Sequence, residues 1–102
     1  MALDFAVLKE DETSADFVSL KINEHDELMN LATRLKLPKL LRFEDYFEEA
    51  ELNVAELPQL AEELAVISKS APSIEIAEFA RNLGTLVALA ASRRQPISVI
   101  PD

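Results

Sequence analysis

The chain has 102 residues, no cysteine, one histidine and a formal net charge of −9 at pH 7. This length predicts a single domain over residues 1–102, and the lack of cysteine excludes a disulfide framework and thiolate chemistry. The negative charge argues against a nucleic-acid or anionic-membrane partner, because both need Lys and Arg for phosphate contacts, and it favours a basic partner.

Two segments near the N-terminus predict strands joined in a β-hairpin. In residues 2–8 (ALDFAVL) and 16–22 (DFVSLKI), large apolar residues alternate with small or polar ones. Alternation with this period indicates a strand with one buried face. Residues 9–15 (KEDETSA) are polar and have the length of a hairpin connector. We therefore expect a hairpin over about residues 2–22.

The next segment predicts a helix that starts at Asn23 and ends near Lys36, ahead of Pro38. Asn is a favoured N-cap, and acidic residues follow it in the first turn. Proline disfavours helical backbone at the residue before it. The apolar residues repeat at helical spacing: Leu28, Leu31, Ala32 and Leu35.

Residues 39–50 (KLLRFEDYFEEA) fit two patterns. One set of apolar residues matches a helix face: Leu40, Phe43, Phe47 and Ala50. Another matches a strand face that Asp45 interrupts: Leu41, Phe43 and Phe47. We expect a short helix followed by an irregular stretch.

Residues 53–56 (NVAE) have the form of a capping box, with Asn53 as the N-cap and Glu56 three residues later. Apolar residues then follow at helical spacing: Leu57, Leu60, Ala61, Leu64 and Ile67. Pro58 lies too deep for an ideal first turn if Asn53 is the cap. This position predicts one lost backbone hydrogen bond and a bend in the helix.

The longest uniform segment is Ile74–Ala91 (IEIAEFARNLGTLVALAA), which predicts a helix continuing to about Arg94. Its first half is amphipathic, and its second half is apolar on all sides, which indicates burial. Gly84 costs about 1 kcal/mol relative to Ala inside a helix, so we expect another backbone to approach it closely. The core face is predicted to contain Ile76, Phe79, Ala80 and Leu83.

Residues 97–100 (ISVI) predict a short strand that joins the hairpin, because an isolated hairpin is only marginally stable. Strands and helices are segregated along the chain, which favours the α+β class. We expect a small antiparallel sheet, made of the N-terminal hairpin plus the C-terminal strand, packed against about three helices.

No motif predicts a catalytic, cofactor-binding or metal site, and we expect that the protein is not an enzyme. His25 is the only histidine, and the chain has no G-x-S-x-G nucleophile motif. One His and no Cys exclude ordinary structural zinc, and a single glycine excludes glycine-rich phosphate loops. We expect His25 to be a partly buried or surface histidine, so His25→Ala should leave biological activity intact apart from any change in stability.

The most distinctive feature is charge segregation. The window from Phe43 to Ile67 has no Lys or Arg and contains eight acidic residues. Aromatic residues beside charges are typical of interface centres. The candidate partner-binding residues are Glu44, Asp45, Tyr46, Phe47, Glu48, Glu49, Glu51 and Glu56. The alternative is a solvated face, with the two aromatic side chains in the core.

Residues 1–8 (MALDFAVL) and 25–46 (HDELMNLATRLKLPKLLRFEDY) resemble small bacterial immunity proteins of polymorphic toxins, in particular the contact-dependent growth inhibition immunity proteins. The resemblance covers nearly the whole chain. These proteins share a role and not a set of residues, so it assigns no residue a function. It implies a cytosolic protein that binds a cognate toxin C-terminal domain, often a basic nuclease, and blocks its active site.

A second class remains open: a small acidic structural or regulatory protein-interaction domain, including a homodimer through the apolar residues 86–91. No charged segment followed by an apolar one opens the chain, so we expect no signal peptide and a cytoplasmic location.

Overall fold

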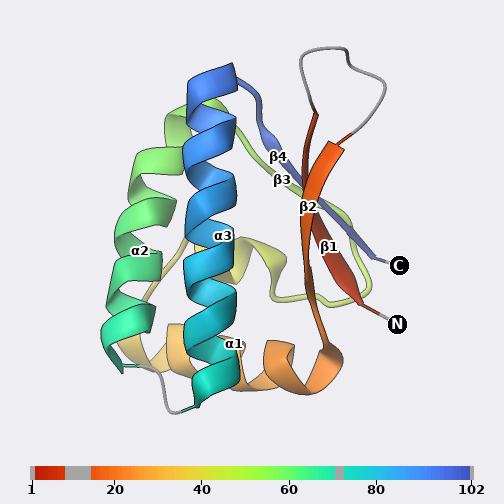
Figure 1. Ribbon diagram of the computed structural model, residues 1–102. Coiled ribbons are helices and arrows are strands. Elements are labelled where there is room, and N and C mark those ends of the chain that lie inside the picture. The colour runs from red at the N-terminus through yellow and green to blue at the C-terminus, as the bar shows by residue number, and fades with distance from the viewer. Residues whose placement is uncertain (1, 9–14, 71–72, 102) are drawn as a thin grey trace.

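The computed structural model describes residues 2–8, 15–70 and 73–101. Its sheet contains four strands: β1 (Leu3–Leu8), β2 (Ala15–Leu20), β3 (Ala50–Leu52) and β4 (Ile97–Pro101). Their order is β2-β1-β4-β3, and every neighbouring pair is antiparallel (Figure 1). The predicted hairpin and the pairing of the C-terminal strand with it are confirmed, but Ile22, predicted in the second strand, is exposed and begins α1. Most of the predicted connector, residues 9–14, lies outside the described residues.

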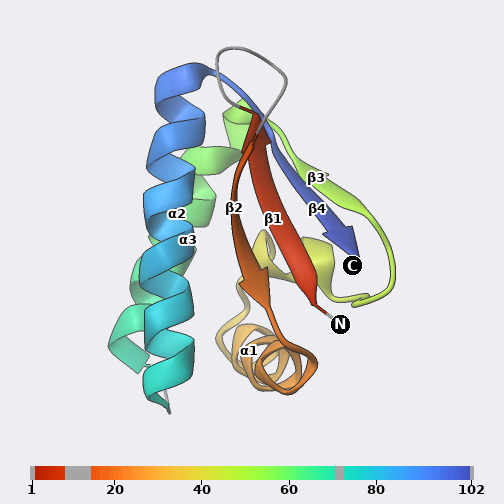
Figure 2. The same cartoon turned by 45° about the vertical axis from the view of Figure 1, so that its right-hand side comes forward.

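Three helices accompany the sheet: α1 (Ile22–Leu35), α2 (Leu57–Ser70) and α3 (Ile74–Arg93). Helices α2 and α3 lie side by side on one face of the sheet, and α1 runs crosswise below its end (Figures 1 and 2). This arrangement confirms the predicted α+β class and the predicted long helix. Strand β3 was not predicted, and it adds a fourth, short edge strand to the sheet.

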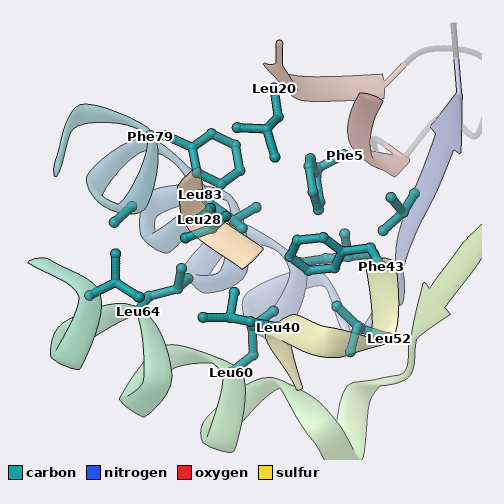
Figure 3. Close-up of a cluster of buried hydrophobic side chains, with 14 of the residues drawn as sticks. Phe5, Leu20, Leu28, Leu40, Phe43, Leu52, Leu60, Leu64, Phe79 and Leu83 are labelled. Atoms are coloured by element: carbon teal, nitrogen blue, oxygen red, sulfur yellow. The ribbon is translucent and has the colours of Figure 1, made fainter. Parts of the chain in front are cut away.

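The core lies between the sheet and the helices (Figure 3). Phe5 on the central strand β1 is fully buried, and its ring meets Phe43 and Phe79 edge-on at centroid distances of 4.7 and 5.5 Å. Edge-to-face contacts at this distance are favourable for aromatic rings. Leu83 is also fully buried, so the predicted core face of α3 is confirmed.

The start of α1 differs from the prediction by two residues. The N-cap is Lys21 and not Asn23, because the Glu24 carboxylate accepts from the Lys21 backbone amide at 3.1 Å and begins the helix earlier. The predicted end is confirmed, since the helix stops at Leu35 and Lys36 adopts a left-handed conformation with φ 58°. Pro38 follows closely and prevents continuation.

The capping box at Asn53 is confirmed, but it caps a different element. Asn53 Oδ1 accepts from the Glu56 amide at 3.2 Å, and Glu56 Oε1 accepts from the Asn53 amide at 3.1 Å. These bonds close a 3₁₀-helix, η2 (Val54–Glu56), and α2 begins after it. Pro58 therefore lies in the first turn of α2, where its missing N–H needs no partner within the helix. The predicted loss of a hydrogen bond inside the helix is wrong.

Two interpretations of the α3 sequence are also wrong. A Cβ added at Gly84 would meet no atom within 4 Å, so no other backbone approaches this glycine closely. Gly84 instead lines an apolar groove of about 350 Å³ between α2 and α3, together with Ala61 and Ala88. Leu86 and Val87 are buried in the core, so most of the large apolar surface suggested for a homodimer at residues 86–91 is internal.

Candidate protein-binding surface

Residues 39–50 form a 3₁₀-helix, η1 (Leu40–Phe43), followed by an irregular segment that leads into β3. The prediction of a short helix and an irregular stretch is confirmed. Leu40 and Phe43 are buried, and the Phe43 carbonyl oxygen accepts a hydrogen bond from His25 Nε2 at 2.8 Å. His25 is itself only 4% exposed, so it is more deeply buried than the partly buried or surface histidine that we expected. The segment is therefore tied to α1 at one end and to the sheet at the other.

Tyr46 is an internal contact of this segment and is not available to a partner. Its side chain is 5% exposed, and its hydroxyl donates to the Leu20 carbonyl oxygen at 3.3 Å. Its ring also meets the His25 ring edge-on at 5.0 Å. The prediction of Tyr46 as a partner-binding residue is wrong, because this side chain is buried. Tyr46 lies in an irregular segment, so neither a helical nor a strand pattern indicates that it turns inward.

Residues on both sides of the buried Tyr46 are exposed to solvent. Phe47 is 64% exposed, and its amide donates to Asp45 Oδ1 at 2.9 Å, which closes a local turn. Five carboxylates are exposed: Glu44, Asp45, Glu48, Glu49 and Glu51. Across the part of the chain that the structure describes, none of these five forms an ion pair. We call the five carboxylates and Phe47 the acidic segment.

Glu56 belongs to a different environment, although it lies in the same cation-free window of sequence. Its Oε2 atom pairs with Lys39 Nζ at 3.2 Å and with the Arg42 guanidinium. The hydrogen bond from the Asn53 backbone amide lowers the pKa of the Glu56 carboxyl, and the cations of Lys39 and Arg42 lower it further. Because its charge is already neutralised within the molecule, Glu56 does not fit the predicted partner-binding role.

Glu63 is the carboxylate that the sequence analysis left without a role. It is 4% exposed, and its two oxygens accept from the backbone amides of Lys39 and Leu40 at 3.1 and 2.9 Å. Gln59 Nε2 adds a third hydrogen bond at 3.1 Å. Glu63 thus satisfies the free amides at the start of η1 from another helix. The partners lie more than twenty residues apart, so no local motif could have revealed the contact.

The acidic segment gives the described part of the molecule an exposed, negatively charged surface. Within residues 2–8, 15–70 and 73–101, no three His, Cys, Asp or Glu side chains are grouped to hold a metal ion. None of the described helices is long and apolar enough to cross a membrane. No protein-family model, curated protein or solved structure matches the chain.

Proposed function

We propose that this protein is a bacterial immunity protein of the cytoplasm that binds the C-terminal domain of a cognate toxin and neutralises it by covering its active site. The observation that carries the proposal is the acidic segment, in which Phe47 and five carboxylates are exposed and none of the five has an ion-pair partner among the described residues. The likeness of residues 1–8 and 25–46 to immunity proteins of contact-dependent growth inhibition systems points the same way.

The expected toxin domain is a basic nuclease. A nuclease needs Lys and Arg to hold the phosphates of its substrate. Carboxylates arranged on a complementary surface compete for those cations and attract the toxin over long distances, which speeds association. Phe47 is exposed to solvent in the free protein and offers an apolar contact to the toxin domain. Binding by the acidic segment therefore blocks the substrate and needs no catalytic residue.

The test measures binding to the toxin domain encoded beside this gene. Reversing Asp45, Glu48, Glu49 and Glu51 to Lys should slow association at low salt by about tenfold or more, because long-range attraction contributes at least this factor to steered encounters. The association rate should also lose most of its salt dependence. The variant should fail to protect cells that express the toxin domain.

A matched control reverses four exposed carboxylates elsewhere on the molecule: Asp26, Glu62, Glu75 and Glu78. Both variants change the net charge equally, so the control separates the effect of the acidic segment on the association rate from the effect of overall charge. Circular dichroism checks that each variant is folded. Equal association rates for the wild type and the first variant, or no binding of the toxin domain to the wild type, would rule out the proposal.

A further inference from the structure

The sheet has a second face, turned away from the helices. Leu3, Phe5 and Val7 of β1 are fully buried on the helix side, so the alternate residues of this strand lie on the opposite, outer face. Figure 2 shows α2 and α3 on one side of the sheet, and no helix of the described residues covers the other side. Pairing across the strands adds side chains of β2 and β4 to the outer face.

This outer face carries three large exposed apolar side chains alongside polar ones. The polar residues are Asp4, Ser19 and Ser98, and the Ser19 hydroxyl donates to Asp4 Oδ1 at 2.6 Å. Phe17 on the edge strand β2 is 66% exposed, Leu8 on β1 is 46% exposed and Ile100 on β4 is 43% exposed. Ala6 lies directly opposite Phe17 and fills the space between the strands. An antiparallel sheet with one solvated face normally carries polar residues there. Several large apolar side chains on one open face are typical of a contact surface.

The outer face adjoins the acidic segment. Ser98 of β4 pairs with Ala6 on one side and with Glu51 of β3 on the other, so the outer face runs from Phe17 to a carboxylate across the width of the sheet. Glu49, Glu51 and Ile100 line one surface groove of about 380 Å³. The two features therefore lie on one surface, which carries Phe17 beside the polar Ser19 and Asp4 toward β2 and is acidic toward β3.

The carboxylates at the border of this surface indicate which kind of partner binds to it. A second copy of this chain, placed face to face, would bring Glu49 and Glu51 into the same interface as the equivalent carboxylates, and juxtaposed like charges are costly. A basic protein supplies cations for those residues and apolar side chains for Phe17. We propose, building on the function proposed above, that the outer sheet face is the apolar centre of the interface with the toxin domain, and that the acidic segment is its charged margin.

The two parts of this surface act on different steps of binding. Fully covered aromatic residues at the centre of an interface mainly slow dissociation, whereas charges at the margin mainly speed association. Phe17→Thr retains the strand preference of the position and removes the aromatic ring. We expect dissociation from the toxin domain to become about tenfold faster or more, the effect of losing a central aromatic contact. The association rate should stay within about twofold of the wild type, because no charge changes.

The matched control is Ile74→Thr on α3, which removes an apolar side chain that is 75% exposed on the helix side of the molecule. Its dissociation rate should equal that of the wild type. Leu8→Thr and Ile100→Thr, measured separately, should each speed dissociation, so the inference does not depend on one variant that folds poorly. Thermal unfolding of every free variant checks that the fold is intact.

The outcomes distinguish the two proposals. If the wild type does not bind the toxin domain, both fail. If the wild type binds, and the outer-face variants dissociate at the wild-type rate, the sheet face is excluded and the acidic segment remains the interface. Sedimentation of the free protein completes the test. A stable dimer that Phe17→Thr separates would assign the face to a second copy and overturn the inference, whereas a monomer together with faster dissociation from the toxin domain supports it.

Discussion

Two groups of carboxylates share one stretch of sequence without basic residues, yet they meet opposite environments. Glu56 and Glu63 are matched inside the molecule by Lys39, Arg42 and the amides at the start of η1. The five carboxylates of the acidic segment have no such match among the described residues. Acidic residues that lie close together in the sequence therefore do not all belong to one surface of the folded protein. The fold uses two of the eight carboxylates in this stretch and leaves six exposed, five in the acidic segment and Glu62 on α2.

Internal contacts distinguish the carboxylates that stabilise the fold from those that are only exposed to solvent. The matched pair holds η1 against α2, and η1 in turn fixes the point where the acidic segment leaves the core. Removing a matched carboxylate should destabilise the protein, while neutralising an exposed one should not. Three substitutions test this division through the free energy of unfolding.

The largest effect is expected for Glu63→Ala. The substitution leaves the backbone amides of Lys39 and Leu40 without their acceptor, and each unsatisfied buried donor costs about 1–3 kcal/mol. We expect a loss of about 2–5 kcal/mol in the free energy of unfolding, measured by urea denaturation. The control is Glu62→Ala, its exposed neighbour, which should change stability by less than about 0.5 kcal/mol. Equal results for the two variants would contradict the division.

A smaller effect is expected for Glu56→Gln, which keeps the size of the side chain but removes its charge. Partly exposed charge-assisted contacts contribute about 1 kcal/mol, so we expect a loss of that order at pH 7. The loss should depend on pH. The folded-state pKa of Glu56 lies below its ordinary value of 4.5, so its stabilising contribution is present above that value and disappears as the pH falls through the folded-state pKa.

The wild type and the Glu56→Gln variant should therefore differ clearly in unfolding free energy at neutral pH and converge in acid. Denaturation curves collected from neutral pH to below the ordinary pKa measure this convergence. A difference that stays constant over the whole range would show that the Glu56 charge does not stabilise the fold.

Much of the fold could be predicted because it depends on local patterns. Alternation at residues 2–8 and helical spacing in Ile74–Ala91 directly reflect burial of one face, and both elements are present. The short strand β3 could not be predicted, because Ala50–Leu52 becomes a strand only through pairing with β4. Tertiary context of this kind overrides weak local preference.

The candidate surface was predicted only in part, for the same physical reason. Exposed residues such as Glu48 and Phe47 need no long-range partner, so composition alone located them correctly at the surface. The environments of Tyr46, Glu56 and Glu63 depend on contacts with distant parts of the chain. The outer face of the sheet could not be predicted, because its composition depends on which strands pair and in which register.

The smallest effect on stability is expected for the double substitution Glu48→Gln and Glu49→Gln in the acidic segment. Both side chains are exposed and without an ion pair among the described residues, so neutralising them removes mutual repulsion and no internal contact. Exposed positions of this kind change stability by less than about 0.5 kcal/mol. Any gain should be largest at low ionic strength, because salt screens exposed charges. Urea denaturation at low and high salt measures both quantities. A loss above about 1 kcal/mol would show that these carboxylates support the fold, and it would remove the reason to treat them as a surface reserved for a basic partner.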